Sequence, residues 1–137
     1  MNDRGRRDAP RMGERLAKEG VKPDLIVSSP AVRALTTAEL FAKKLDYKLK
    51  DIVVEKRLYA AAPDDLLELI RELGDKAKHV MLFGHNPEFA DLAHRLSNEV
   101  TEMPTCAVAE FKFDTKSWSD VGTQTPGKVK LYAPKES

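Results

Sequence analysis

Two segments that lie far apart in the sequence place polar side chains between a short apolar run and a proline. In the first, Leu-Ile-Val is followed by Ser28, Ser29 and Pro30, and in the second an apolar run ends in Gly84-His85-Asn86-Pro87. Ser29 and Asn86 are residue types that cap helix N-termini, and a proline at the first helical position needs no hydrogen-bond donor. Both segments therefore predict a strand that leads directly into a helix.

Such strand ends are suited to binding an anion. In an open sheet of parallel strands, the ligand crevice lies outside the carboxyl ends of the strands. Helices that begin there present free N–H groups and the positive end of their dipole to a negatively charged group. We therefore predict an anion pocket around Ser28, Ser29, Gly84 and His85.

Two side chains in these segments could act on a phosphoryl group. Arg33 falls in the first turn of the helix that follows Ser29, and its guanidinium can pair with two phosphate oxygens in a way that lysine cannot. A solvated surface arginine explains Arg33 equally well. His85 follows a glycine, which allows a tight turn into the crevice, although a lone histidine more often has a structural role. Each residue taken alone is ambiguous.

The remaining candidates are interpreted as structural. His79 opens a strand and His94 lies late on a helix, Cys106 fits a small core residue on a strand, and Trp118 fits a loop surface. We find no His, Cys or carboxylate spacing that is typical of a metal site, and we expect neither a metal nor a cofactor. With one cysteine in the sequence no intrachain disulfide can form, which suits a reducing compartment.

Length and charge narrow the class of protein. The 137 residues fit one domain, residues 1–137. A formal net charge of +1 gives no reason to expect nucleic acid or an anionic membrane as a partner. No apolar stretch approaches the roughly 20 residues that span a bilayer, and the N-terminus does not read as a signal peptide. A cytoplasmic protein is therefore the default expectation.

The hydrophobic pattern predicts alternating strands and helices. Helices are expected at 6–19, 31–45, 63–73 and 88–96, and strands at 25–27, 52–54, 79–83, 106–113 and 128–132. Gly20 is expected to stop the first helix. This alternation predicts a three-layer α/β/α sandwich with a mostly parallel sheet that helices cover on both faces.

The same two segments resemble motifs of the histidine phosphatase superfamily. The run from Ser28 to Ala38 is similar to the motif that contributes the second phosphate-binding arginine, and Gly84-His85-Asn86-Pro87 is similar to the motif that contributes the second active-site histidine. Between them, the run from Arg57 to Ala61 resembles the SixA-type phosphohistidine phosphatases, which have the phosphoglycerate mutase-like fold. The resemblance extends to about Phe113.

The resemblance implies a hydrolase that removes phosphoryl groups from phosphohistidine on a signalling protein, without a metal. A histidine on the first strand attacks phosphorus, and water then releases phosphate from the covalent phosphohistidine. His85 would be catalytic, and Arg33, His85, Ser29 and Asn86 would bind phosphate. Three alternatives stay open: a phosphatase for small phosphomonoesters, an inactive phosphate- or phosphoprotein-binding module, and a fragment with no function of its own.

One departure from the family bears on both activity and fold. Family members begin with a central strand that ends in Arg-His-Gly or Arg-His-Ala, whereas this sequence contains no Arg-His pair. We expect roughly 20 to 25 residues to be missing at the N-terminus, through a misassigned start, a truncation or natural loss, and we expect this chain alone to be inactive. The chain should compensate by closing the sheet around the gap, by borrowing a strand from another copy, or by forming a homodimer.

Overall fold

The structure is a computed structural model that describes residues 3–59, 62–73, 79–84, 88–96, 108–112, 118 and 128–132. Its helices and strands follow one another as the sequence predicts, and each predicted element overlaps an observed one. In chain order they are α1 (Asp3–Lys18), β1 (Leu25–Ser28), α2 (Val32–Lys44), the 3-10 helix η1 (Leu49–Asp51), β2 (Val53–Val54), the 3-10 helix η2 (Lys56–Leu58), α3 (Pro63–Arg71), β3 (Val80–Phe83), α4 (Glu88–Leu96), β4 (Val108–Lys112) and β5 (Lys128–Tyr132).

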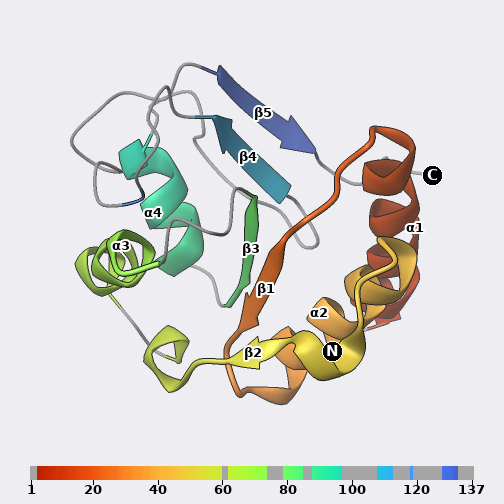
Figure 1. Cartoon of the computed structure of the whole chain (residues 1–137), viewed down its shortest axis with the longest axis horizontal. Helices are drawn as coiled ribbons and strands as arrows, with labels where there is room; N and C mark the ends of the chain where they lie inside the picture. The colour runs from red at the N-terminus through yellow and green to blue at the C-terminus, as the bar shows by residue number, and fades with distance from the viewer. Residues whose placement is uncertain are drawn as a thin grey trace.

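The predicted parallel sheet is present and is small. Its strand order is β2-β1-β3, and both outer strands run parallel to β1 (Figure 1). The register pairs Ser28 of β1 with Val54 of β2 on one side and with Phe83 of β3 on the other. The carboxyl ends of the three strands therefore meet at one edge of the sheet. Strands β4 and β5 form a separate antiparallel pair.

Helices cover this sheet on both faces, because successive strand residues point to opposite sides. Val27 of β1 and Leu82 of β3 pack with the apolar side chains of α3 and α4. Ile26 and Phe83, one residue along each strand, pack instead toward α2, and the ring of Phe83 lies edge-on to Phe41 at 5.3 Å between centroids. Helix α1 lies beside α2 on that face (Figure 1). The predicted three-layer α/β/α arrangement is confirmed.

Gly20 ends α1, as predicted. Its φ of 81° lies in the left-handed region that glycine adopts without a steric cost. The Gly20 N–H donates to the Ala17 carbonyl at 3.1 Å, and the Val21 N–H donates to the Leu16 carbonyl at 3.0 Å. This pair of bonds is the Schellman motif, which satisfies carbonyls that the helix end leaves unpaired.

A tyrosine hydroxyl extends the sheet where β2 is too short to do so. Strand β2 has only two residues, so it does not reach the amino end of β1. There the Ile26 N–H donates to Tyr47 Oη at 3.3 Å, and that hydroxyl donates to the Asp51 carbonyl at 2.9 Å. The side chain of Tyr47 thus satisfies a backbone donor that a longer β2 would have paired.

Two sequence-based expectations are wrong. Trp118 was expected on a loop surface, but it is half-buried against the apolar cluster of α3 and α4, because its large ring gains from leaving water. Closure of the sheet was one of three expected ways in which the chain could compensate for the missing strand. Among the strands that the structure describes, β4 and β5 form a pair separate from β2-β1-β3, so the strands have not closed into one sheet. Borrowing a strand and dimerisation stay predictions. None of the described helices is long and apolar enough to cross a membrane.

Candidate functional site

The ends of the two motif-bearing strands lie side by side. Ser28 and Phe83 are register partners, and the Ser29 N–H donates to the Phe83 carbonyl at 2.9 Å. Ser29 and Gly84, the first residues beyond β1 and β3, therefore meet at the carboxyl edge of the sheet. The sequence predicts this juxtaposition. That these residues bind an anion stays a prediction.

Ser28 and Ser29 are fully buried and hydrogen-bonded within the turn that follows β1. The Ser28 hydroxyl donates to the Ser29 carbonyl at 2.9 Å, and the Ala31 N–H donates to Ser29 Oγ at 3.2 Å. Helix α2 begins at Val32, with Ala31 as its N-cap residue. The prediction that Ser29 caps a helix starting at Pro30 is therefore wrong. The Ser29 hydroxyl accepts from the Ala31 N–H, ahead of the first helical residue, and so stabilises the turn instead.

Arg33 lies in the first turn of α2, as predicted, and its side chain is exposed. The first turn of α2 contains no acidic residue, so no carboxylate offsets the positive end of the helix dipole there. Within the described part of the chain, no ion pair joins the guanidinium of Arg33 to another residue. The first turn of α2 therefore presents a cationic side chain and a positive helix end together.

Gly84 is required for space rather than for backbone conformation. A Cβ added at Gly84 would lie 2.4 Å from Cε1 and 2.5 Å from Cζ of Phe89 on α4, and Gly84 does not adopt a positive φ. The tight turn expected beyond Gly84 falls on residues 85–87, outside the described residues, and stays a prediction. The missing side chain instead lets the ring of Phe89 pack against the backbone where β3 ends.

The other predicted residues divide into those that the structure describes and those that it does not. His85, Asn86 and Cys106 lie outside the described residues, so their roles stay predictions. His79 sits at the amino end of β3, where its N–H donates to Asp24 Oδ2 at 3.0 Å. His94 is exposed in the last turn of α4. Neither described histidine lies at the carboxyl edge of the sheet, which fits their structural interpretation.

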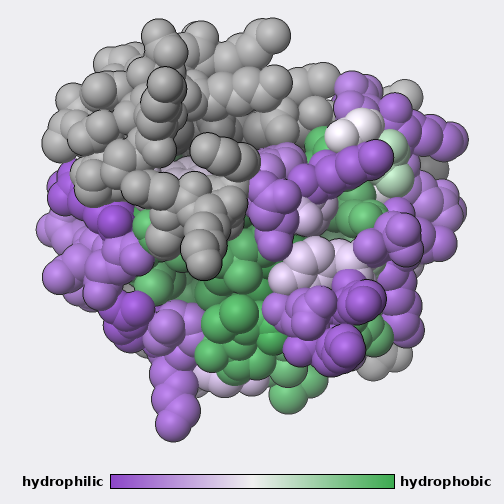
Figure 2. Space-filling view, in the orientation of Figure 1, coloured by the Kyte–Doolittle hydropathy of each residue, from purple (hydrophilic) through white to green (hydrophobic). Residues whose placement is uncertain are grey.

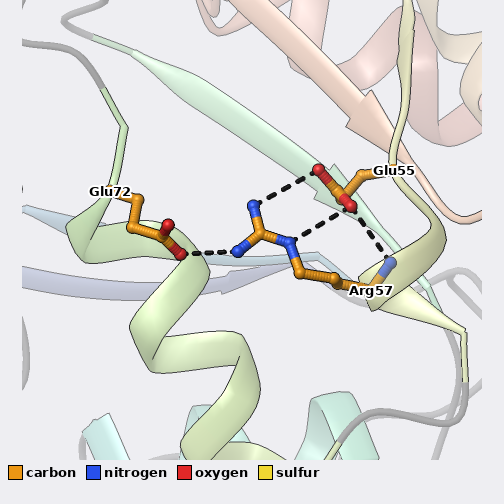
Figure 3. Close-up of polar contacts among 3 residues, drawn as sticks. All are labelled: Glu55, Arg57 and Glu72. Carbon is orange, nitrogen blue, oxygen red and sulfur yellow. Dashed lines mark hydrogen bonds and ion pairs between the residues drawn. The ribbon is translucent and has the colours of Figure 1, made fainter.

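An ion-pair network that the sequence did not reveal stands beside this edge (Figure 3). Glu55 follows β2, and its N–H donates to the Ser28 carbonyl at 2.8 Å. Arg57 Nε donates to Glu55 Oε1 at 3.2 Å, and Arg57 Nη1 donates to Glu72 Oε2 at 2.6 Å. Hydrogen bonds from Arg57 lower the pKa of Glu55, and the same carboxylates raise the pKa of Arg57. The network fastens η2 to the end of α3.

Sequence comparison decides the family. Residues 1–105 match the family model of the histidine phosphatase superfamily (branch 1). The chain belongs to the histidine phosphatase superfamily. Among curated members, the serine/threonine-protein phosphatases Pgam5, mitochondrial, of Drosophila yakuba and Drosophila melanogaster are 36% and 35% identical to it over 63 residues, which is 46% of this chain. The chain spans 22% of the length of these relatives.

Solved structures place the chain with the SixA proteins of the superfamily in fold. SixA from Nakamurella multipartitia superposes with a TM-score of 0.81 at 16% identity, covering 98% of this chain and 84% of that one. SixA from Agrobacterium tumefaciens superposes with a TM-score of 0.70 at 26% identity, covering 78% of this chain and 72% of that one. The protein histidine phosphatase SixA complexed with tungstate superposes with a TM-score of 0.77 at 20% identity, covering 94% of this chain and 81% of that one.

Proposed function

We propose that this chain forms the phosphate-binding part of a phosphohistidine phosphatase that removes phosphoryl groups from phosphohistidine on a signalling protein. The observation that carries the proposal is the bond from the Ser29 N–H to the Phe83 carbonyl, because it brings the ends of the two motif-bearing strands together at one edge of the sheet. Membership of the superfamily and likeness to SixA proteins support the same chemistry.

Positioning and charge stabilisation are the main requirements of phosphoryl transfer. In this proposal Arg33 pairs with two oxygens of the phosphoryl group, assisted by the positive end of α2. His85 is the proposed catalytic residue of the chain, and it directly follows Gly84, which lies at the carboxyl edge of the sheet. Ser29 and Asn86 complete the proposed set of phosphate-binding residues. The chemistry needs no metal ion or cofactor.

The attacking histidine must come from elsewhere than the described histidines, because His79 and His94 lie away from the carboxyl edge. We place it on a strand at the outer edge of β3. Since the Phe83 carbonyl bonds toward β1, the N–H and carbonyl groups of Leu82 point to that outer edge. The nucleophilic nitrogen bonds to phosphorus as the bond from phosphorus to the substrate nitrogen breaks, the leaving imidazole takes a proton, and water hydrolyses the resulting phosphohistidine.

A second candidate has its own support. The curated relatives that match over 63 residues are named serine/threonine-protein phosphatases, so a phosphoserine or phosphothreonine protein is the alternative substrate.

The single Cys106 and the signalling substrate suit a cytoplasmic setting. Without the attacking histidine the chain itself would bind phosphate and not turn over.

Phosphate binding and hydrolysis test these proposals separately. We expect inorganic phosphate to bind the purified chain in calorimetry, Arg33→Ala to weaken that binding about tenfold, and Arg33→Lys to restore only part of it. Lys43→Ala, which changes an exposed cation at the other end of α2, should leave phosphate affinity unchanged. Unchanged affinity in Arg33→Ala would refute the site.

Hydrolysis is measured with phosphoramidate, first on the chain and then on a version extended upstream in its reading frame to include an Arg-His segment. Activity should appear only in the extended version. Hydrolysis by the chain alone would refute the proposal that the attacking histidine lies outside it.

A further inference from the structure

The outer edge of β2 carries backbone hydrogen-bonding groups that no other described residue pairs with. The Glu55 N–H donates to the Ser28 carbonyl, so Glu55 faces β1 and the preceding residue, Val54, faces the opposite way. The Ile52 N–H is taken by the Leu49 carbonyl at 3.2 Å. The Ile52 carbonyl and both backbone groups of Val54 therefore point outward from the sheet. These three groups can pair with an added strand.

The side chains of β2 show that its edge, rather than one of its faces, is uncovered. Val53 and Val54 are 45% and 49% exposed. Their register partners Val27 and Ser28 are consecutive residues of β1, so the two valines point to opposite faces of the sheet. A partner docked on one face would cover one valine, whereas a strand along the edge would contact both. Figure 2 shows apolar surface over the region of β2 and the start of α2.

We propose that the outer edge of β2 binds an extended segment of the phosphorylated protein substrate as an additional strand. This inference rests on the proposed function and narrows its substrate class to proteins. Val54 pairs with Ser28, the residue before Ser29. Neighbouring strands lie about 4.8 Å apart, so a strand beyond β2 runs about 10 Å from the end of β1. A long phosphorylated side chain spans much of that distance.

Charge favours a phosphorylated segment over a second copy of this chain. Three exposed lysines flank β2 in the sequence, namely Lys48, Lys50 and Lys56; of the two flanking carboxylates, Asp51 and Glu55, the second is paired with Arg57. Lysines beside a short edge strand oppose pairing with another copy, because like charges would meet. The same lysines attract a segment that carries phosphate. Val32, 77% exposed and adjacent to Arg33, offers a further apolar side chain next to the proposed phosphate site.

A proline substitution isolates the edge from the rest of the fold. Val54→Pro removes the outward N–H and leaves the Glu55 N–H, which bonds β1, in place; proline is tolerated at an edge position of this kind. Val54→Thr is the matched control, because it keeps the N–H and the β-branched shape. The probes are a short peptide with a central non-hydrolysable phosphohistidine analogue, the same peptide without phosphate, and phosphoramidate. Binding is measured by calorimetry, and mass by sedimentation.

The phosphorylated peptide should bind the wild-type chain about tenfold more tightly than phosphoramidate does, since main-chain bonds supply affinity in strand addition. Val54→Pro should weaken peptide binding about fivefold and leave phosphoramidate binding unchanged, whereas Val54→Thr should retain most of the gain. Equal affinity for peptide and phosphoramidate, or equal peptide binding by Val54→Pro and Val54→Thr, would overturn the inference. A dimer that Val54→Pro dissociates would overturn it in favour of self-association.

Failure of the proposed function gives a different result. In that case phosphate and phosphoramidate do not bind, or Arg33→Ala binds them as the wild type does. The unphosphorylated peptide still reports on the edge, because its binding depends on the Val54 N–H and not on Arg33.

Discussion

Replacing Gly84 by alanine tests the packing at the end of β3. The new Cβ would lie 2.4 Å from Cε1, 2.5 Å from Cζ and 3.1 Å from Cδ1 of Phe89. Carbon atoms in favourable contact are about 3.5–4.0 Å apart, so the ring must move by roughly 1 Å or more. Phe89 packs against the cluster formed by α3 and α4, which resists that movement.

Two opposing terms set the size of the effect. Alanine lowers the entropy of the unfolded chain, which stabilises a compatible site by about 0.4–1 kcal/mol. Gly84 does not use a positive φ, so this gain applies in full. Inserting a methyl group into a packed site costs about 1–3 kcal/mol. The steric term is larger, and we expect Gly84→Ala to lower the free energy of unfolding by about 1–2 kcal/mol.

A double-mutant cycle measures whether Phe89 is the cause. Free energies of unfolding are obtained from urea titrations followed by circular dichroism for the wild type, Gly84→Ala, Phe89→Leu and the double variant. Leucine removes the ring atoms that the new Cβ would meet, so the double variant should be more stable than additivity predicts by about 1 kcal/mol. Additive effects, or a neutral Gly84→Ala, would show that the ring does not confine this position.

Two further predictions concern the surroundings of the sheet. Tyr47→Phe removes the acceptor for the Ile26 N–H and should lower the free energy of unfolding by about 1–2 kcal/mol. The hydrogen exchange of the Ile26 amide should become faster, and an unchanged exchange rate would contradict this prediction. Because Arg57 lowers the pKa of Glu55 below its ordinary 4.5, the carboxylate stabilises the fold above that pH and loses this effect as pH falls through the lowered value. The stability difference between wild type and Glu55→Gln should therefore shrink in acid and in high salt, and a difference that does not vary with pH contradicts it.

The predictions that held depended on local patterns. An apolar run before Ser28 and a helical pattern after it were sufficient to predict β1 and α2, and the alternation of elements predicted the layers. Gly20 ends α1 because its left-handed conformation is a local preference. The meeting of Ser29 with Gly84 followed from a general rule, since parallel strands end at the same edge.

The predictions that failed depended on contacts between distant residues. Ser29 is not the cap of α2, which begins three residues later at Val32, and its N–H is bonded to Phe83 on another strand. Arg57 joins Glu72 across the length of α3, and no spacing rule connects them. In each case the deciding partner is absent from the local sequence window.

The bond between Ser29 and Phe83 joins the first half of the chain to the second, which has a consequence for folding. The register partners Val27 and Val53 of β1 and β2 are closer in the sequence than Val27 and Leu82 of β1 and β3. Pairing of β3 with β1 therefore closes the longer loop, and pairing between distant segments is slow. A proteolytic fragment that stops before β3 would keep Arg33 and lack the strand end that meets Ser29. An anion bound at the proposed site would stabilise only molecules in which both halves have met, so its binding would report completed assembly.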